Sequence, residues 1–192
     1  MFQVEKTAQI VGLFLWHCCD TSYTMPYLKL LKLLYFTERK GLLDYGYSIT
    51  GDKLYSLPHG PILTSTCDLM TGTTKDLKWS KWIRSVADFS LCLARPINNE
   101  DYTESFDLLN KIEIDIVDEL YKKYKDLSRW EIRDLTHNPD VCPEWSDPHG
   151  SATKITLERL FTSNNRTEEE AQAVRAQIEQ DDSYQCLMQD MI

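Results

Sequence analysis

The residues best suited to chemistry lie in one proline-rich stretch, residues 136–150, which is called the proline-rich loop below. It holds two histidines, a thiol and a tryptophan, namely His137, His149, Cys142 and Trp145. Imidazole and thiolate are zinc ligands, but spacings of five and seven residues match no standard zinc pattern, and no fourth ligand is present. A metal site in this stretch is therefore not predicted, and neither is a cofactor.

The same stretch could hold a nucleophile. Cys142 would act as the attacking thiol and His137 as its base. However, a thiol directly before a proline, without a glycine turn to form an oxyanion hole, is a poor scaffold for such chemistry. We therefore interpret the stretch as a rigid surface loop pinned by Trp145, and we predict no catalytic residue.

The other two histidines fit structural roles. His17 lies in an apolar segment of helical periodicity, where a histidine is more often a hydrogen-bonded core residue than a ligand. His59 precedes Gly60 and Pro61, which we expect to start a helix. A histidine in that position is more often a local hydrogen-bonding brace than a catalyst.

The element expected to position all of these residues is an apolar helix. Leucines and aromatic residues fall on every turn of Leu28–Phe36, and only Lys29 and Lys32 are expected to reach water. The pattern predicts a helix from Pro26 to about residue 40, buried on most of its circumference. We expect the other elements of the domain to pack against this helix.

The remaining pattern predicts a mainly α-helical, compact domain with a small antiparallel β-sheet. We expect a hairpin over residues 48–56, with its turn at Gly51-Asp52, and a candidate strand over 89–95 laid against that hairpin. The segment 71–88 is ambiguous. Further helices are expected over residues 5–19, 62–70 and 106–124, from residue 129, and over 157–161 and 168–180, with caps at Ser105, Ser128, Thr156 and Thr167.

The last part of the chain differs from the rest, so we divide it into a domain, 1–165, and a C-terminal helix and tail, 166–192. The helix is polar nearly all round and would be marginal alone in water. The tail carries Leu187, Met188 and Ile192, a composition that suits a segment that docks elsewhere.

In the helix over 106–124, the side chains expected to face the core are Leu109, Ile112, Ile116, Leu120 and Tyr124.

Composition restricts the partners. The 30 acidic and 21 basic residues give a net charge of −9, so the surface repels phosphate and we expect no direct binding of nucleic acid. The longest apolar run, Ile10–Trp16, is far shorter than the roughly 20 residues of a membrane span, and signal-peptide features are lacking. We expect a cytoplasmic protein with reduced cysteines and no membrane partner.

An ordered set of short motifs resembles the Panacea domain, the family that includes the SocA antitoxin and phage-associated relatives. The resemblance covers about residues 5–162 and implies a mainly helical domain with a small antiparallel sheet. The motifs are Lys32-Leu33-Leu34-Tyr35-Phe36, Gly60-Pro61, Leu127-Ser128, Leu135-Thr136-His137, Trp145, Ile155-Thr156 and Leu160-Phe161.

This resemblance implies an antitoxin that neutralises a cognate protein toxin, encoded by a neighbouring gene, through direct protein–protein binding. An alternative is a proteolytic adaptor that delivers the toxin to an ATP-dependent protease. The rival class is a small hydrolase or transferase that uses His137, Cys142 and His149. We expect a protein that is not an enzyme.

Partner-binding or motif residues follow from residue type and from the resemblance. Exposed tryptophans are common anchors of protein interfaces, and an acidic surface would steer a basic toxin. The candidates are His59, Gly60, Pro61, Trp79, Trp82, Trp130, Thr136, His137, Trp145, Leu187, Met188 and Ile192.

Overall fold

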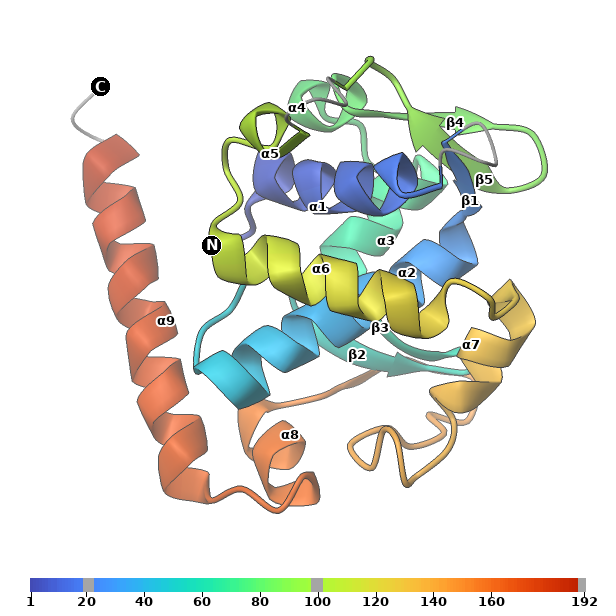
Figure 1. The fold of residues 1–192 in the computed structure, drawn as a ribbon. Helices are drawn as coiled ribbons and strands as arrows, with labels where there is room; N and C mark the ends of the chain where they lie inside the picture. The colour runs from blue at the N-terminus through green and yellow to red at the C-terminus, as the bar shows by residue number, and fades with distance from the viewer. Residues whose placement is uncertain (19–22, 98–101, 190–192) are drawn as a thin grey trace.

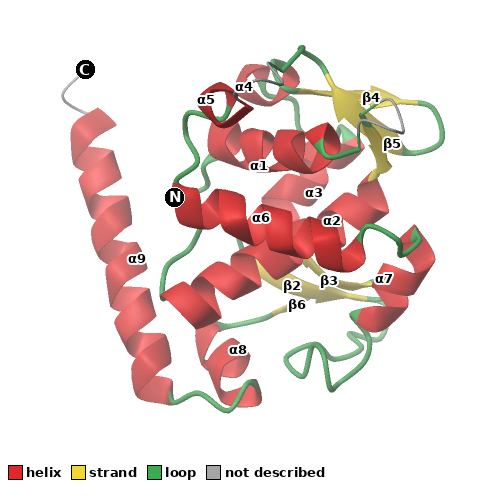
Figure 2. Cartoon of the chain, in the orientation of Figure 1, coloured by secondary structure: helices red, strands yellow, loops and turns green. Residues whose placement is uncertain are grey.

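The computed structural model describes residues 1–18, 23–97 and 102–189 of the 192-residue chain. The described part is mainly α-helical and contains two small three-stranded antiparallel sheets, which confirms the predicted fold class (Figure 1 and Figure 2).

The helices are α1 (Val4–Trp16), α2 (Tyr27–Lys40), α3 (Thr64–Thr71), α4 (Leu77–Ser80), α5 (Tyr102–Ser105), α6 (Lys111–Tyr124), α7 (Arg129–Leu135), α8 (Leu157–Ser163) and α9 (Glu168–Gln189). The strands are β1 (Thr24–Pro26), β2 (Leu54–Leu57), β3 (Gly60–Leu63), β4 (Ile83–Val86), β5 (Ser90–Leu93) and β6 (Thr153–Lys154). One sheet has the order β1-β5-β4 and the other the order β3-β2-β6.

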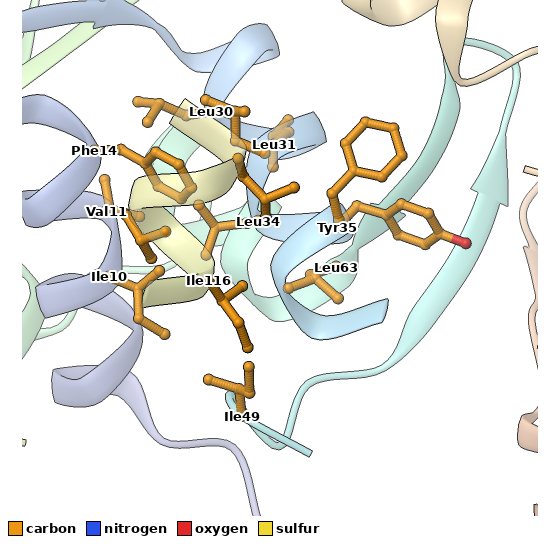
Figure 3. Close-up of a cluster of buried hydrophobic side chains, with 14 of the residues drawn as sticks. Ile10, Val11, Phe14, Leu30, Leu31, Leu34, Tyr35, Ile49, Leu63 and Ile116 are labelled. Carbon is orange, nitrogen blue, oxygen red and sulfur yellow. The ribbon is translucent and has the colours of Figure 1, made fainter. Parts of the chain in front are cut away.

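Helix α2 forms the centre of the core, as its sequence predicted. It packs against α1, α6, α7 and strand β3, and its leucines from Leu30 to Leu34 are buried. Figure 3 shows Val11 and Phe14 of α1 gathered with Leu34 of α2 and Ile116 of α6. Full burial of one such side chain contributes roughly 1.5–3 kcal/mol relative to exposure, so this junction is a main source of stability.

The two lysines of α2 were expected to reach water, and that prediction is wrong. Both side chains are buried because neighbouring elements cover α2 on all sides. The Lys29 ammonium donates to the carbonyl oxygens of Lys125 and Leu127, at 2.7 and 2.6 Å. It therefore satisfies carbonyls at the C-terminal end of α6, where a cation is also favoured by the helix dipole.

Gly41 does not end the helical segment. A π-helical turn, Gly41–Tyr45, follows α2 directly, and the chain leaves it at Gly46 with φ of 73°. A Cβ atom at Gly41 would lie only 2.6 Å from the Ile49 side chain. Gly41 is thus required by close packing, while Gly46 supplies the left-handed conformation that terminates the segment.

The hairpin is displaced from its predicted position. It is formed by β2 and β3, with Leu54 opposite Leu63 and Leu57 opposite Gly60. Residues 48–50 do not form a strand, because they hydrogen-bond to the buried carboxylate of Glu38. Ser48 Oγ donates to Glu38 at 2.5 Å, and the Thr50 amide donates to the same carboxylate at 2.7 Å.

Pro61 lies in β3, so the predicted helix start at this proline is also wrong. Helix α3 begins at Thr64, and its first amides are capped from outside the helix. The Asp52 carboxylate accepts from the amides of Ser65 and Thr66, at 3.0 and 2.7 Å. A cap supplied from more than ten residues away leaves no local sequence signal.

The strand expected over 89–95 exists as β5, but it does not join the hairpin. It pairs with β1 and β4, whereas the third strand beside the hairpin is β6. The ambiguous segment 71–88 contains α4 and β4.

The helix expected over 106–124 begins later, at Lys111. Asn110 forms a capping box with Glu113, each accepting from the other's backbone amide at 3.0 Å, so Ser105 is not its cap. Ile112 is 41% exposed, and Ile114 and Val117 lie inward in its place. The predicted caps at Ser128 and Thr156 are confirmed.

Helix α9 is longer than predicted and runs along one side of the domain (Figure 1). Ala171 and Val174 are buried against the rest of the protein, and α9 packs on α8. An ion pair joins Arg175 to Glu158, and another joins the N-terminal amine to Asp182. These contacts hold the first two thirds of the helix.

Candidate functional site

Motif residues that are far apart in the sequence meet beneath the β2–β3 hairpin. Gly60 has φ of +91°, and a Cβ atom there would lie 2.5 Å from Thr136 Oγ1 and 2.8 Å from Lys32 Nζ. His137 Nε2 would lie 3.2 Å from the same atom. Three polar groups thus surround one glycine, and only glycine allows the strand to approach them. We call Lys32, Gly60, Pro61, Thr136 and His137 the motif cluster.

Lys32 is the most unusual member of the motif cluster. Its side chain is fully buried, and its ammonium donates to the carbonyl oxygen of Pro61 at 2.9 Å. Removal from water lowers the pKa of Lys32 from 10.5 to about 7, and the positive charge of Arg133 acts in the same direction. The amine is therefore partly uncharged near neutral pH, a property that sequence reasoning missed.

His137 is held between the motif cluster and Trp145. The two rings stack with centroids 4.4 Å apart, and Trp145 Nε1 donates to the carbonyl oxygen of Leu57 at 3.1 Å. Trp145 therefore pins the proline-rich loop to the hairpin. His137 Nε2 is buried and lacks a hydrogen-bond partner within the described residues. Burial, followed by the nearby Lys32 charge, lowers the pKa of His137, which favours the neutral imidazole.

A second buried network holds the other side of the proline-rich loop. Glu144 accepts from the Tyr35 hydroxyl at 2.5 Å and from Arg39 Nε at 2.8 Å. Its other oxygen accepts from Asn164 Nδ2 at 3.0 Å. The loop is therefore fixed to α2 and to the end of α8. Sequence reasoning missed Glu144, since nothing in its local pattern marks it as buried.

The proline-rich loop does not arrange its reactive groups for the chemistry considered from the sequence. Cys142 is buried, which raises the pKa of its thiol to about 12 and disfavours the thiolate. His149 is exposed at a turn. Across the described ranges, no group of three or more histidine, cysteine, aspartate or glutamate side chains is placed to hold a metal ion.

The candidate partner-binding residues divide by exposure. Trp79 and Trp82 are 6% and 3% exposed, so their expected role as surface anchors is wrong; they fill the core, where Trp82 stacks on Phe106. Trp130 is 50% exposed on α7 and lies 5.0 Å from each of two guanidinium groups, those of Arg129 and Arg133. His59 is exposed at the hairpin turn, Leu187 and Met188 are exposed on α9, and Ile192 lies outside the described residues.

The chain belongs to the antitoxin SocA-like, Panacea domain family, whose sequence model matches residues 30–146. The match confirms the resemblance and spans every member of the motif cluster. No curated protein and no solved structure matches the chain. Among the described residues, every helix is too short or too polar to cross a bilayer.

The geometry around Gly60 yields a stability prediction. Gly60→Ala should lower the free energy of unfolding by about 3 kcal/mol or more, because the positive φ and the new Cβ contacts both cost energy. Gly72→Ala is the matched control: its φ is +77°, and a Cβ there meets nothing within 4 Å, so a loss of about 1 kcal/mol is expected. Urea unfolding measures both; equal losses would contradict the crowding described here.

Lys32 yields a prediction about pH. Folding lowers the pKa of Lys32 from 10.5 to about 7, so the unfolded chain binds more protons between these values. The free energy of unfolding therefore rises with pH across this window, by up to about 1.4 kcal/mol per pH unit from this group. Lys32→Met should flatten that rise. Urea unfolding of both proteins at several pH values measures the slopes, and identical slopes would refute the assignment.

Proposed function

We propose that this protein is an antitoxin that neutralises a cognate protein toxin by direct, stoichiometric binding. Membership of the SocA-like antitoxin family over residues 30–146 is the observation that carries the proposal. The toxin is expected to come from a neighbouring gene.

The geometry of the motif cluster supports binding rather than turnover. The Lys32 ammonium donates to the Pro61 carbonyl oxygen, which joins α2 to the hairpin. The His137 ring stacks on Trp145, which joins the cluster to the proline-rich loop. The buried, protonated thiol of Cys142 is unsuited to nucleophilic attack. We therefore infer that the protein is not an enzyme and that it acts by binding the toxin through its surface.

Charge supports a basic partner. A net charge of −9 gives the surface a negative field that accelerates association with a positively charged protein. Toxins that act on nucleic acid carry a positively charged surface, because their substrate is a polyanion.

A titration tests the proposal. The purified product of the adjacent gene is mixed with increasing amounts of this protein, and residual toxin activity and complex formation are followed together. We expect activity to fall linearly and to vanish near a fixed small-integer ratio, with a complex on size-exclusion chromatography. Neutralisation at far less than one equivalent, or without a complex, would contradict direct binding.

Degradation is measured in the same system. If the toxin's half-life in cells falls only when this protein and an ATP-dependent protease are both present, the protein acts as an adaptor. Under the proposal made here, neutralisation persists when the protease is absent.

A further inference from the structure

Exposed apolar side chains gather where α9 faces the amino-terminal segment. A cleft of about 600 Å³ lies between them. Its apolar lining consists of Met1, Phe2, Val4, Leu108, Tyr184 and Met188, and its charged lining consists of Glu5, Asp76, Lys6 and Lys78. Met1, Leu108, Tyr184 and Met188 are all exposed, although each is large and apolar. Concentrated exposed apolar surface of this kind marks an interaction site.

The apolar lining of this cleft continues along the C-terminal third of α9. Tyr184, Leu187 and Met188 are spaced three and four residues apart, so they share one helix face. They are 60%, 61% and 63% exposed. Tyr184 and Met188 line the cleft together with Gln185, and Leu187 lies beside them on the same helix face. The apolar face therefore borders the cleft and stays mostly in water.

The earlier part of α9 anchors the helix to the rest of the protein and so fixes the position of this face. Ala171 and Val174 are buried, and Asp182 pairs with the N-terminal amine directly before the apolar face begins. In Figure 1 the end of α9 stands clear of the other helices. A helix that is anchored at its start and already formed at its end loses little conformational freedom when a partner binds.

The sign of the charge on α9 identifies the occupant. Residues Glu168–Gln189 contain six acidic side chains and one basic one, so this helix carries more than half of the protein's net charge of −9. Glu179, Asp181 and Asp182 lie next to the apolar face. A second copy of this chain would bring two such helices together and would be repelled. A segment with apolar residues on one side and lysine or arginine at its edges would be attracted.

The half-exposed tryptophan of α7 is already in contact with two cations. The guanidinium groups of Arg129 and Arg133 lie over the Trp130 ring, and Arg133 is also paired with Asp134. A lysine or arginine of a basic partner would have to compete with these groups for the ring. The two surfaces also lie on opposite sides of the molecule in Figure 1.

We propose that the apolar face of α9, with the adjoining cleft, is the docking surface for a basic amphipathic segment of the toxin. The proposal rests on the antitoxin function proposed above. It places the toxin contact largely outside residues 30–146, the part that the family model matches. The matched domain then serves as the platform that holds α9.

The test uses the full chain and the purified product of the adjacent gene. A triple variant, Tyr184→Ser, Leu187→Ser and Met188→Ser, should weaken binding at least about thirtyfold, because it removes the exposed apolar anchors. Its thermal unfolding should be unchanged, since the three side chains are mostly in water. Calorimetry gives the affinity, and circular dichroism confirms that α9 is retained.

A charge variant gives an independent readout. Glu179→Gln with Asp181→Asn should slow association and reduce its dependence on salt, while dissociation changes little. The matched control is Phe89→Ser, in the turn between β4 and β5. Phe89 is 74% exposed, and its removal should leave toxin affinity unchanged.

The outcomes separate the two proposals. If the wild type does not bind the toxin, the antitoxin function is wrong and the docking surface falls with it. If the wild type binds and the triple variant binds within about threefold of it, only the docking surface is wrong. Loss of binding in Trp130→Ala with retention in the triple variant would assign the contact to α7. A triple variant that dissociates a wild-type dimer while keeping toxin affinity would assign the face to self-association.

Discussion

The fold depends on the burial of α2 around its whole circumference. A helix in that position cannot leave a polar side chain unpaired, because a buried group without a partner costs several kcal/mol. Four charged residues of α2 are each paired with a different segment. Lys29 binds the end of α6, Lys32 binds β3, Glu38 binds residues 48–50, and Arg39 binds the proline-rich loop. These contacts determine where the connecting segments lie.

This constraint explains what the family motifs do. The leucine-rich run supplies the buried helix, and Gly60 permits β3 to come within reach of Lys32. His137 and Trp145 close the same junction from the proline-rich loop. Motifs of this kind specify an architecture. The matched region, 30–146, therefore records how the domain is built.

The proline-rich loop shows why composition alone misleads about chemistry. Histidine and cysteine become reactive when the fold exposes them and stabilises the needed protonation state. Here the thiol of Cys142 is buried beside Glu144, which keeps it protonated, while His149 points into solvent at a turn. Glu144, two residues further on, is bound by Tyr35 and Arg39 of α2. The loop is a rigid connection between α2 and the hairpin.

The sequence by itself determined what depends on nearby residues. The apolar periodicity of α2, the capping box of Ser128 with Glu131 and the Thr156 cap all follow from short spacings. The family assignment follows from the order of short motifs along the chain. The tertiary structure decided what depends on distant groups: that Asp52 caps α3, that residues 48–50 bind Glu38 instead of forming a strand, and that Lys32 is buried. These features arise from hydrogen bonds between segments that meet only when the core closes, because burial removes the alternative of pairing with water.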